Sequence, residues 1–217
     1  MSAAEVAMPR RVAQLPKDHV GRPVPWFVAW INGIPDFRII RPRGIDRALA
    51  EKRCWVCGGR SGSRAGHRAF TVGPMCAVNR TSAEPPAHRD CAVYSATACP
   101  FLTTPQMTRR ERRMPAGTSN PAGTMIRRNP GVALVWISRG WSVFSDGRGG
   151  ILFDLGEPAE VLWFARGREA TRAEVLASID SGLPLLGRIA QDEGPEAVAE
   201  LERQHQRALQ YVPAEVA

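Results

Sequence analysis

The sequence predicts an α+β fold in which a treble-clef-like zinc module precedes a small antiparallel β-meander with C-terminal helices. Two groups of signals carry this prediction. All five cysteines lie in residues 54–99, at spacings that suit a metal ion, and four short apolar runs broken by turn residues follow residue 130. The 217 residues suit one medium domain or two small ones, and 44% hydrophobic with 23% charged residues is close to the globular average.

Composition divides the chain into four segments. Residues 1–22 are polar and are expected to form a loosely ordered N-terminus. Residues 23–102 are expected to hold a hairpin and the zinc module, because an Asn-Gly pair at 32–33 between two apolar runs is a strong hairpin signal. Residues 103–129 are rich in Pro, Gly, Ser, Thr and Arg, as in a basic linker or long loop, and residues 130–217 carry the meander and the helices.

Local signals place the front elements. Residues 23–30 and 37–40 are expected to form the strands of the hairpin, and a short helix is expected over 46–53 with Asp46 as its cap. Nothing in the spacing decides whether this hairpin adds a strand to the rear sheet, so that alternative stays open.

The rear segment is expected to begin with four strands, over residues 131–138, 141–145, 150–155 and 159–165. Thr171 and Glu174 have the spacing of a capping box, which predicts a helix that ends near Gly182. A short helix over 185–192 is expected next. Gly-Pro at 194–195 then starts a last helix that runs to about Tyr211.

Two pairs of residues have the spacing of zinc ligands. Cys54 and Cys57 form C-x2-C, followed by two glycines that permit a tight turn. His88 and Cys91 form H-x2-C after Glu-Pro-Pro at 84–86, where prolines favour a helix start, so both side chains would lie on the first turn of one face. Between the pairs, Gly-Pro at 73–74 predicts a hairpin. Knuckle, hairpin and helix make up a treble clef that holds zinc through these four residues.

Cys76 and Cys99 are rival ligands, and either could also be a plain core residue. The alternative for all five cysteines is that they are small buried apolar side chains. A structural zinc ion would contribute on the order of 10 kcal/mol to the free energy of folding.

The motifs CWVCG, GPMCAVNR, EPPAHRDCA and ACPFL resemble those of an uncharacterised group of proteins from bacterial and phage genomes. The resemblance runs through both halves of the chain and implies no activity. It suggests an assembly component of a phage or mobile element as one alternative function.

A second, looser resemblance is to the His-Asn-His nucleases, in which one histidine activates water and a metal ion stabilises the cleaved phosphate. His67, Asn79 and His88 occur in the order of that family's motif. Two departures weaken it. Gly66 stands where the family places an acidic residue or a histidine, and His88 would have to be both catalyst and zinc ligand. A metal-dependent nuclease is therefore an alternative rather than the main prediction.

The charge of the chain is concentrated at the front. Residues 1–130 carry 21 basic and 8 acidic residues, and residues 131–217 carry 8 basic and 13 acidic ones. All but two of the 29 basic residues are arginines, which suit phosphate geometry, although a GC-rich genome would give the same bias. The residues expected to contact nucleic acid are Arg109, Arg110, Arg112, Arg113, Arg127 and Arg128; a solvated loop is the alternative.

Several classes are excluded by the same sequence. No apolar run is long enough to cross a bilayer, no apolar core of a secretory signal is present, and no phosphate-cradling glycine motif points to a nucleotide cofactor. Five cysteines without an export signal favour a reducing compartment, so a cytoplasmic location is expected. The predicted function is a zinc-stabilised, non-catalytic binding or adaptor protein, whose partner is nucleic acid or another protein.

Overall fold

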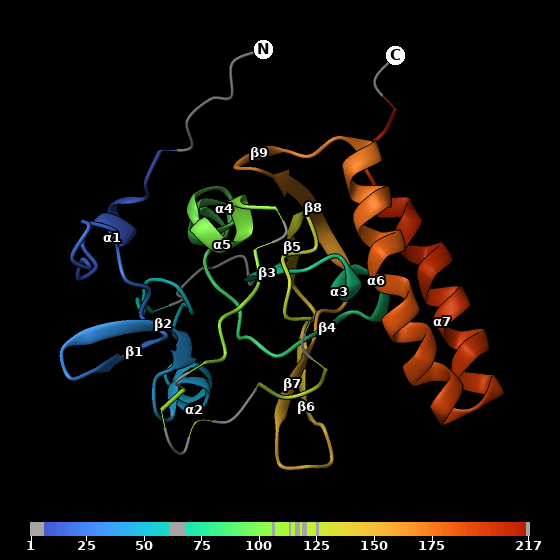
Figure 1. Cartoon of the computed structure of the whole chain (residues 1–217), viewed down its shortest axis with the longest axis horizontal. Coiled ribbons are helices and arrows are strands. Elements are labelled where there is room, and N and C mark those ends of the chain that lie inside the picture. Colours follow the sequence, from blue (N-terminus) through green and yellow to red (C-terminus); the bar gives the residue numbers. More distant parts are fainter. Residues whose placement is uncertain are drawn as a thin grey trace.

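The structure is a computed structural model that describes residues 7–60, 68–105, 107–112, 114–115, 118, 121–124 and 126–215. It confirms a mixed α+β architecture with antiparallel sheets and C-terminal helices (Figure 1). In chain order the elements are α1 (Arg10–Ala13), β1 (Val28–Ile31), β2 (Ile34–Ile40), α2 (Gly44–Ala50), β3 (Arg68–Val72), α3 (Met75–Asn79), β4 (Thr81–Ser82), α4 (Arg89–Ala98), α5 (Pro100–Thr103), β5 (Ala133–Ser138), β6 (Ser142–Ser145), β7 (Ile151–Asp154), β8 (Pro158–Ala165), β9 (Arg168–Glu169), α6 (Arg172–Glu193), α7 (Pro195–Ala208) and a 3-10 turn (Leu209–Tyr211).

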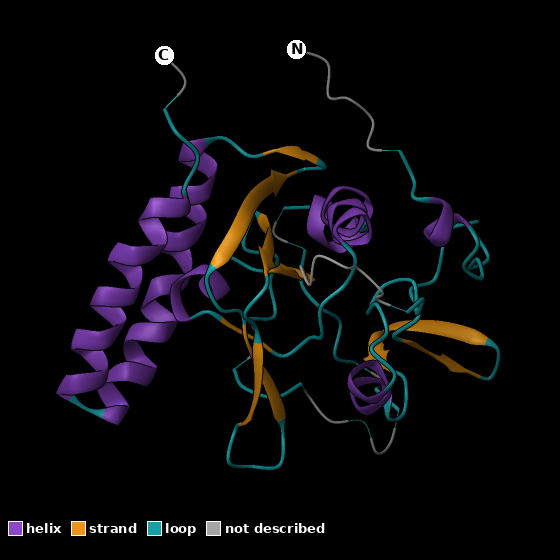
Figure 2. Cartoon of the chain, turned by 180° about the vertical axis from the view of Figure 1, so that it is seen from behind, coloured by secondary structure: helices purple, strands orange, loops and turns teal. Residues whose placement is uncertain are grey.

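A four-stranded antiparallel sheet in the order β3-β5-β8-β9 forms the middle layer of the molecule. In Figure 1, α6 and α7 lie on one side of this sheet and α4 and α5 lie on the other. Figure 2 shows the same layers from behind. Because β3 comes from the front of the chain and pairs with β5, one sheet contains strands from both predicted halves.

The position of β5 between two cores explains why its sequence is continuously apolar. All six of its residues are buried, and they alternate between two cores. Leu134 and Trp136 pack in the core beside α6 and α7, whereas Val135 and Ile137 pack in the core beside α4. A strand covered on both faces has no polar side, so the alternation that marks a half-exposed strand is missing.

The predicted single meander is wrong in its pairing. β5 and β8 belong to the central sheet, whereas β6 and β7 form a second sheet in the order β4-β7-β6. The chain changes sheets at Gly140 and Gly156, which approach each other so closely that a Cβ on Gly156 would lie 2.6 Å from the Gly140 carbonyl oxygen. Gly156 also has a φ of +61°, so this crossing needs glycine.

The Asn-Gly hairpin is confirmed in a shorter form. β1 and β2 pair across Asn32 and Gly33, whose φ angles of 51° and 78° are those of a type I′ turn. The hairpin forms its own two-stranded sheet and does not join the rear strands. The next helix, α2, begins at Gly44 rather than at Asp46, which therefore lies in its first turn and is not its cap.

The hairpin expected around Gly73 and Pro74 is wrong. β3 is followed directly by a helix, α3, which starts after Pro74 and buries Met75, Ala77 and Val78. Proline is tolerated at a helix start, because the backbone N–H that it lacks would have no partner there. The three buried side chains face the core beside α6 and α7, so packing favours the helix.

The C-terminal helices also differ from expectation. The capping box of Thr171 and Glu174 is confirmed, but the helix it starts continues through Gly182 and Pro184 to Glu193. Gly182 is buried where a Cβ would lie 2.6 Å from the Met75 sulfur, so it permits close approach of α3 rather than ending the helix. Pro184 is exposed, and solvent can satisfy the carbonyl it leaves unpaired. The last helix starts at Pro195 as predicted.

In the part of the chain that the structure describes, no helix has the length and apolar character needed to cross a membrane.

Replacing Thr171 with Ala removes the capping box at the start of α6. The Thr171 hydroxyl accepts from the Glu174 N–H at 3.3 Å, and the Glu174 carboxylate accepts from the Thr171 N–H at 2.9 Å. We expect a loss of about 1 kcal/mol in the free energy of unfolding, measured by denaturant titration. Gln191→Ala, on the exposed surface of the same helix, is the control and should leave that free energy nearly unchanged.

Candidate metal centre

The first pair of predicted ligands sits on a tight turn between α2 and β3. The backbone N–H of Cys54 donates to the Gly59 carbonyl at 2.9 Å, and the N–H of Gly58 donates back to the Cys54 carbonyl at 2.9 Å. Gly58 has a φ of +68°, and a Cβ there would lie 2.4 Å from the Trp26 ring. Only glycine fits both the backbone angle and the packing, which explains the glycine directly after C-x2-C.

The second pair sits at the start of α4. His88 is the residue before the helix and Cys91 lies on its first turn. Ala87 and Ala69 exchange two backbone hydrogen bonds of 3.1 and 2.7 Å, which ties the residue before His88 to β3. The central sheet therefore sets the position of His88 and, through it, of the whole second pair.

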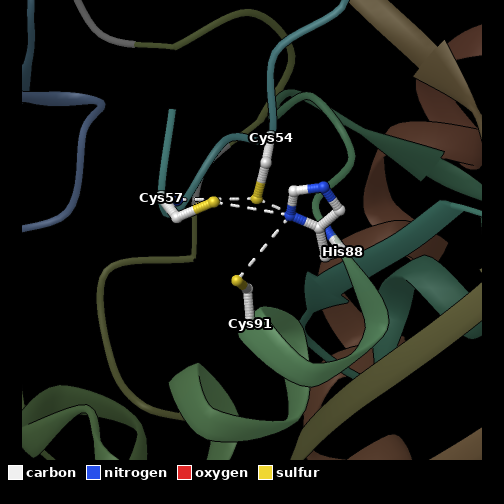
Figure 3. A group of neighbouring side chains, drawn as sticks. All are labelled: Cys54, Cys57, His88 and Cys91. Carbon is white, nitrogen blue, oxygen red and sulfur yellow. Dashed lines mark hydrogen bonds between the residues drawn. The ribbon is translucent and has the colours of Figure 1, made fainter. Parts of the chain in front are cut away.

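These elements bring Cys54, Cys57, His88 and Cys91 together (Figure 3). Their ligand atoms all lie within 4.8 Å of one another. The His88 Nδ1 is 3.4 Å from the Cys57 sulfur and 3.9 Å from the Cys91 sulfur. Tetrahedral zinc, with Zn–S of about 2.3 Å and Zn–N of about 2.0 Å, would set N···S separations of about 3.5 Å. The four side chains thus have the types and the spacing of a metal site.

Backbone groups surround the four side chains. The Nε2 of His88 lies 3.3 Å from the Arg60 carbonyl oxygen, to which it donates when Nδ1 faces the sulfurs. The N–H groups of Cys57 and His88 point at the Cys54 sulfur, at 3.5 and 3.3 Å. Such outer contacts fix the imidazole tautomer and stabilise thiolate charge.

The electrostatics of the cluster favour a cation. Hydrogen bonds from Cys57 and Cys91 hold the pKa of the Cys54 thiol far below its ordinary value, and Cys54 and Cys57 in turn raise the pKa of Cys91. The same two sulfurs raise the pKa of His88 to about 10. One thiolate is thus favoured only while its neighbours keep their protons. A divalent ion would replace those protons and allow all three sulfurs to ionise.

Burial of two of the sulfurs increases the need for a cation at the cluster. Cys54 and Cys91 are both 0% exposed and belong to the core beside α4. Arg68, at the start of β3, interacts with the cluster electrostatically: burial lowers its pKa, and the negative charge of Cys54 opposes that shift. The cluster therefore spans the edge of this core: Cys54 and Cys91 are buried, whereas Cys57 and His88 are half-buried.

The rival cysteines are not in the cluster. Cys76 lies on α3 and packs against the core beside α6 and α7, and burial raises the pKa of its thiol to about 12. Cys99 ends α4, and burial raises the pKa of its thiol as well. In the described residues no second group of three or more potential metal ligands occurs.

The structure gives no support to the nuclease alternative. His67 lies outside the described residues. The side chain of Asn79 accepts a hydrogen bond from the Thr81 N–H at 3.0 Å, which is a local turn contact. One nitrogen of His88 faces the sulfurs and the other faces the Arg60 carbonyl, so neither is left to activate water.

The predicted basic run is only partly available for contact. Arg109 donates to the Arg38 carbonyl at 2.5 Å, Arg127 pairs with Glu111 at 2.9 Å, and Arg128 donates to the Ser181 carbonyl at 3.0 Å. Arg113 lies outside the described residues. Arg110 and Arg112 are exposed, and Arg38 bonds to both of their carbonyls, which fixes their loop on β2.

No protein-family model matches the chain, and neither a curated protein nor a solved structure shows significant similarity to it. The resemblance to bacterial and phage proteins therefore stays a prediction.

Sequence reasoning missed the surroundings of the cluster. The Arg60 carbonyl, the link from Ala69 to Ala87 and the Trp26 ring against Gly58 are all long-range contacts. Only the glycine after C-x2-C carried a signal, since a glycine at that position predicts a left-handed turn.

Gly58→Ala tests the shape of this turn. The new Cβ meets the Trp26 ring and an unfavourable φ, so we expect the affinity for zinc to fall at least tenfold in a chelator competition titration. Gly33→Ala is the matched control: its φ is +78°, but no atom lies within 4 Å of the added Cβ. Equal zinc affinities in the two variants would show that the contact with Trp26 does not shape the site.

Proposed function

We propose that this protein is a zinc-stabilised, non-catalytic binding protein whose partner is nucleic acid. The observation that carries the first part is the convergence of three sulfurs and one imidazole nitrogen within 4.8 Å, with Cys54 and Cys91 buried. Sulfur and nitrogen ligands select zinc over magnesium or calcium, which prefer oxygen. Four protein ligands leave no position for substrate, so the site is structural.

We further propose that this module is a treble clef. A knuckle supplies one ligand pair and the start of α4 supplies the other, as that arrangement requires. The chain between them differs from a simple hairpin, because β3 bonds to Ala87 through an isolated bridge and α3 is inserted before β4.

Charge and loop geometry support the nucleic-acid partner. The first 130 residues have an excess of 13 positive charges, nearly all of them arginines. Arg38 donates to the backbone carbonyls of Arg110 and Arg112, so the backbone that carries these two exposed arginines is held beside β2. An ordered loop loses less conformational entropy on binding than a free chain would.

Metal analysis tests the zinc site. We expect one zinc ion per chain in protein purified without added metal or chelator, measured by inductively coupled plasma mass spectrometry. Cys91→Ser should lose most of this zinc, because it removes a buried ligand. Cys76→Ser is the control and should keep it, because Cys76 lies outside the cluster. A wild-type protein without zinc would overturn the proposal.

Fluorescence anisotropy with a labelled oligonucleotide tests the partner. We expect binding that weakens steeply between about 50 and about 200 mM salt, because phosphate contacts release counterions. Arg110→Gln combined with Arg112→Gln should reduce the slope of log K against log salt by about 2. Absence of binding to single and double strands at the lower salt would contradict the nucleic-acid function and favour a protein partner.

A further inference from the structure

Three arginine side chains gather around one tryptophan beside the knuckle. The guanidinium carbons of Arg41, Arg47 and Arg53 lie 4.8, 5.8 and 5.9 Å from the centre of the Trp26 ring. Cation–π attraction stabilises each of these contacts. Each guanidinium nevertheless repels the other two, so the cluster needs negative charge nearby.

The protein supplies less negative charge than this cluster carries. Glu51 is shared by two of the arginines, at 3.0 Å from Arg47 and 2.5 Å from Arg53. Arg41 donates to the Trp26 carbonyl at 3.1 Å, and among the described residues no carboxylate forms an ion pair with it. Three positive charges therefore face one negative charge.

This excess of positive charge destabilises the charged form of Arg41. Burial lowers the pKa of its guanidinium, and the charges of Arg47 and Arg53 lower it further. Glu51 pairs with the other two arginines, but its single charge balances only one of them. An anion from outside would complete the cluster in the same way.

We propose that phosphate groups of a nucleic-acid backbone bind this arginine cluster of Arg41, Arg47 and Arg53. The inference rests on the proposed function and names the surface that serves it. A planar guanidinium fork matches phosphate oxygens in pairs, which a flexible lysine does not. The contacts with Trp26 hold all three guanidinium groups near one ring, so less side-chain entropy is lost on binding.

Neighbouring charges extend the surface in one direction. Arg43, at the start of α2, has a side chain that is 83% exposed, and its contact with Asp46 is a long 3.9 Å. β2 leads from the cluster to Arg38, which holds the loop of Arg110 and Arg112. A phosphate backbone could therefore run from the cluster along β2 to that loop.

The cluster also depends on the metal centre. Trp26 packs against Gly58 of the knuckle, and its backbone N–H donates to the Val56 carbonyl at 2.7 Å. Loss of zinc would release the knuckle and with it the ring that the three guanidinium groups contact. Phosphate binding should therefore weaken when zinc is removed.

Arg41→Gln is the main test, with the zinc-loaded full chain and a fluorescein-labelled oligonucleotide. Affinity should fall about tenfold, and the salt slope should fall by about 1, because a charge-assisted phosphate contact is lost. Arg41→Lys should keep the slope and lose part of the affinity, since it keeps the charge but not the fork. Arg188→Gln, an exposed charge on α6, is the control and should bind like the wild type.

A second measurement uses the wild-type protein, so its result does not depend on whether a variant folds. In an NMR titration with inorganic tripolyphosphate at constant ionic strength, the indole N–H signal of Trp26 should shift. The signal of Trp163, whose indole donates to the Tyr211 carbonyl in the other core, should not.

The outcomes separate the two proposals. Oligonucleotide binding that is unchanged in Arg41→Gln, with no shift of the Trp26 signal, overturns the cluster as the phosphate site and leaves the nucleic-acid function standing. A Trp26 shift without oligonucleotide binding supports the phosphate site and overturns the nucleic-acid function. Absence of both overturns both.

Discussion

Three sulfur atoms and an imidazole nitrogen lie within 4.8 Å of one another at the edge of the core beside α4, and thiolates held this closely repel one another unless a cation lies between them. The rest of that core offers little to offset the repulsion. Many of its buried side chains are small, and each alanine contributes little apolar area compared with leucine or phenylalanine. The alanines are Ala48, Ala69, Ala87, Ala92, Ala96 and Ala133. A bound metal ion would add the free energy of folding that this core lacks.

The two sides of the central sheet therefore differ in what stabilises them. Beside α6 and α7, aromatic and aliphatic side chains such as Phe70, Trp136 and Phe153 are almost fully buried, and hydrophobic burial is sufficient. Beside α4, the four potential ligands are linked to the N-terminal elements, because Trp55 next to Cys54 stacks on Phe27 at 4.9 Å. Without an ion bound between these ligands, the front hairpin would loosen before the rear helices.

Local chemistry made part of this molecule predictable. The turn at Asn32 and Gly33, the capping box at Thr171 and the two ligand pairs each depend on residues within a few positions of one another. The pairing of β3 with β5 joins residues more than sixty positions apart and leaves no trace in either segment. α3 and the long α6 were mispredicted for a related reason: Met75 and Gly182 fit each other, and neither position is interpretable alone.

The distribution of charge follows from this architecture. Front arginines that face the acidic rear segment have partners there: Arg89 pairs with Glu160 at 2.5 Å, and Arg80 pairs with Glu157. These pairs neutralise positive charge at the contact between the two parts of the chain. Arg41 is not among them, and its two arginine neighbours share a single glutamate. Positive charge thus remains around α2 even after Asp46 and Glu51 have formed their ion pairs, and this excess would attract an extended polyanion.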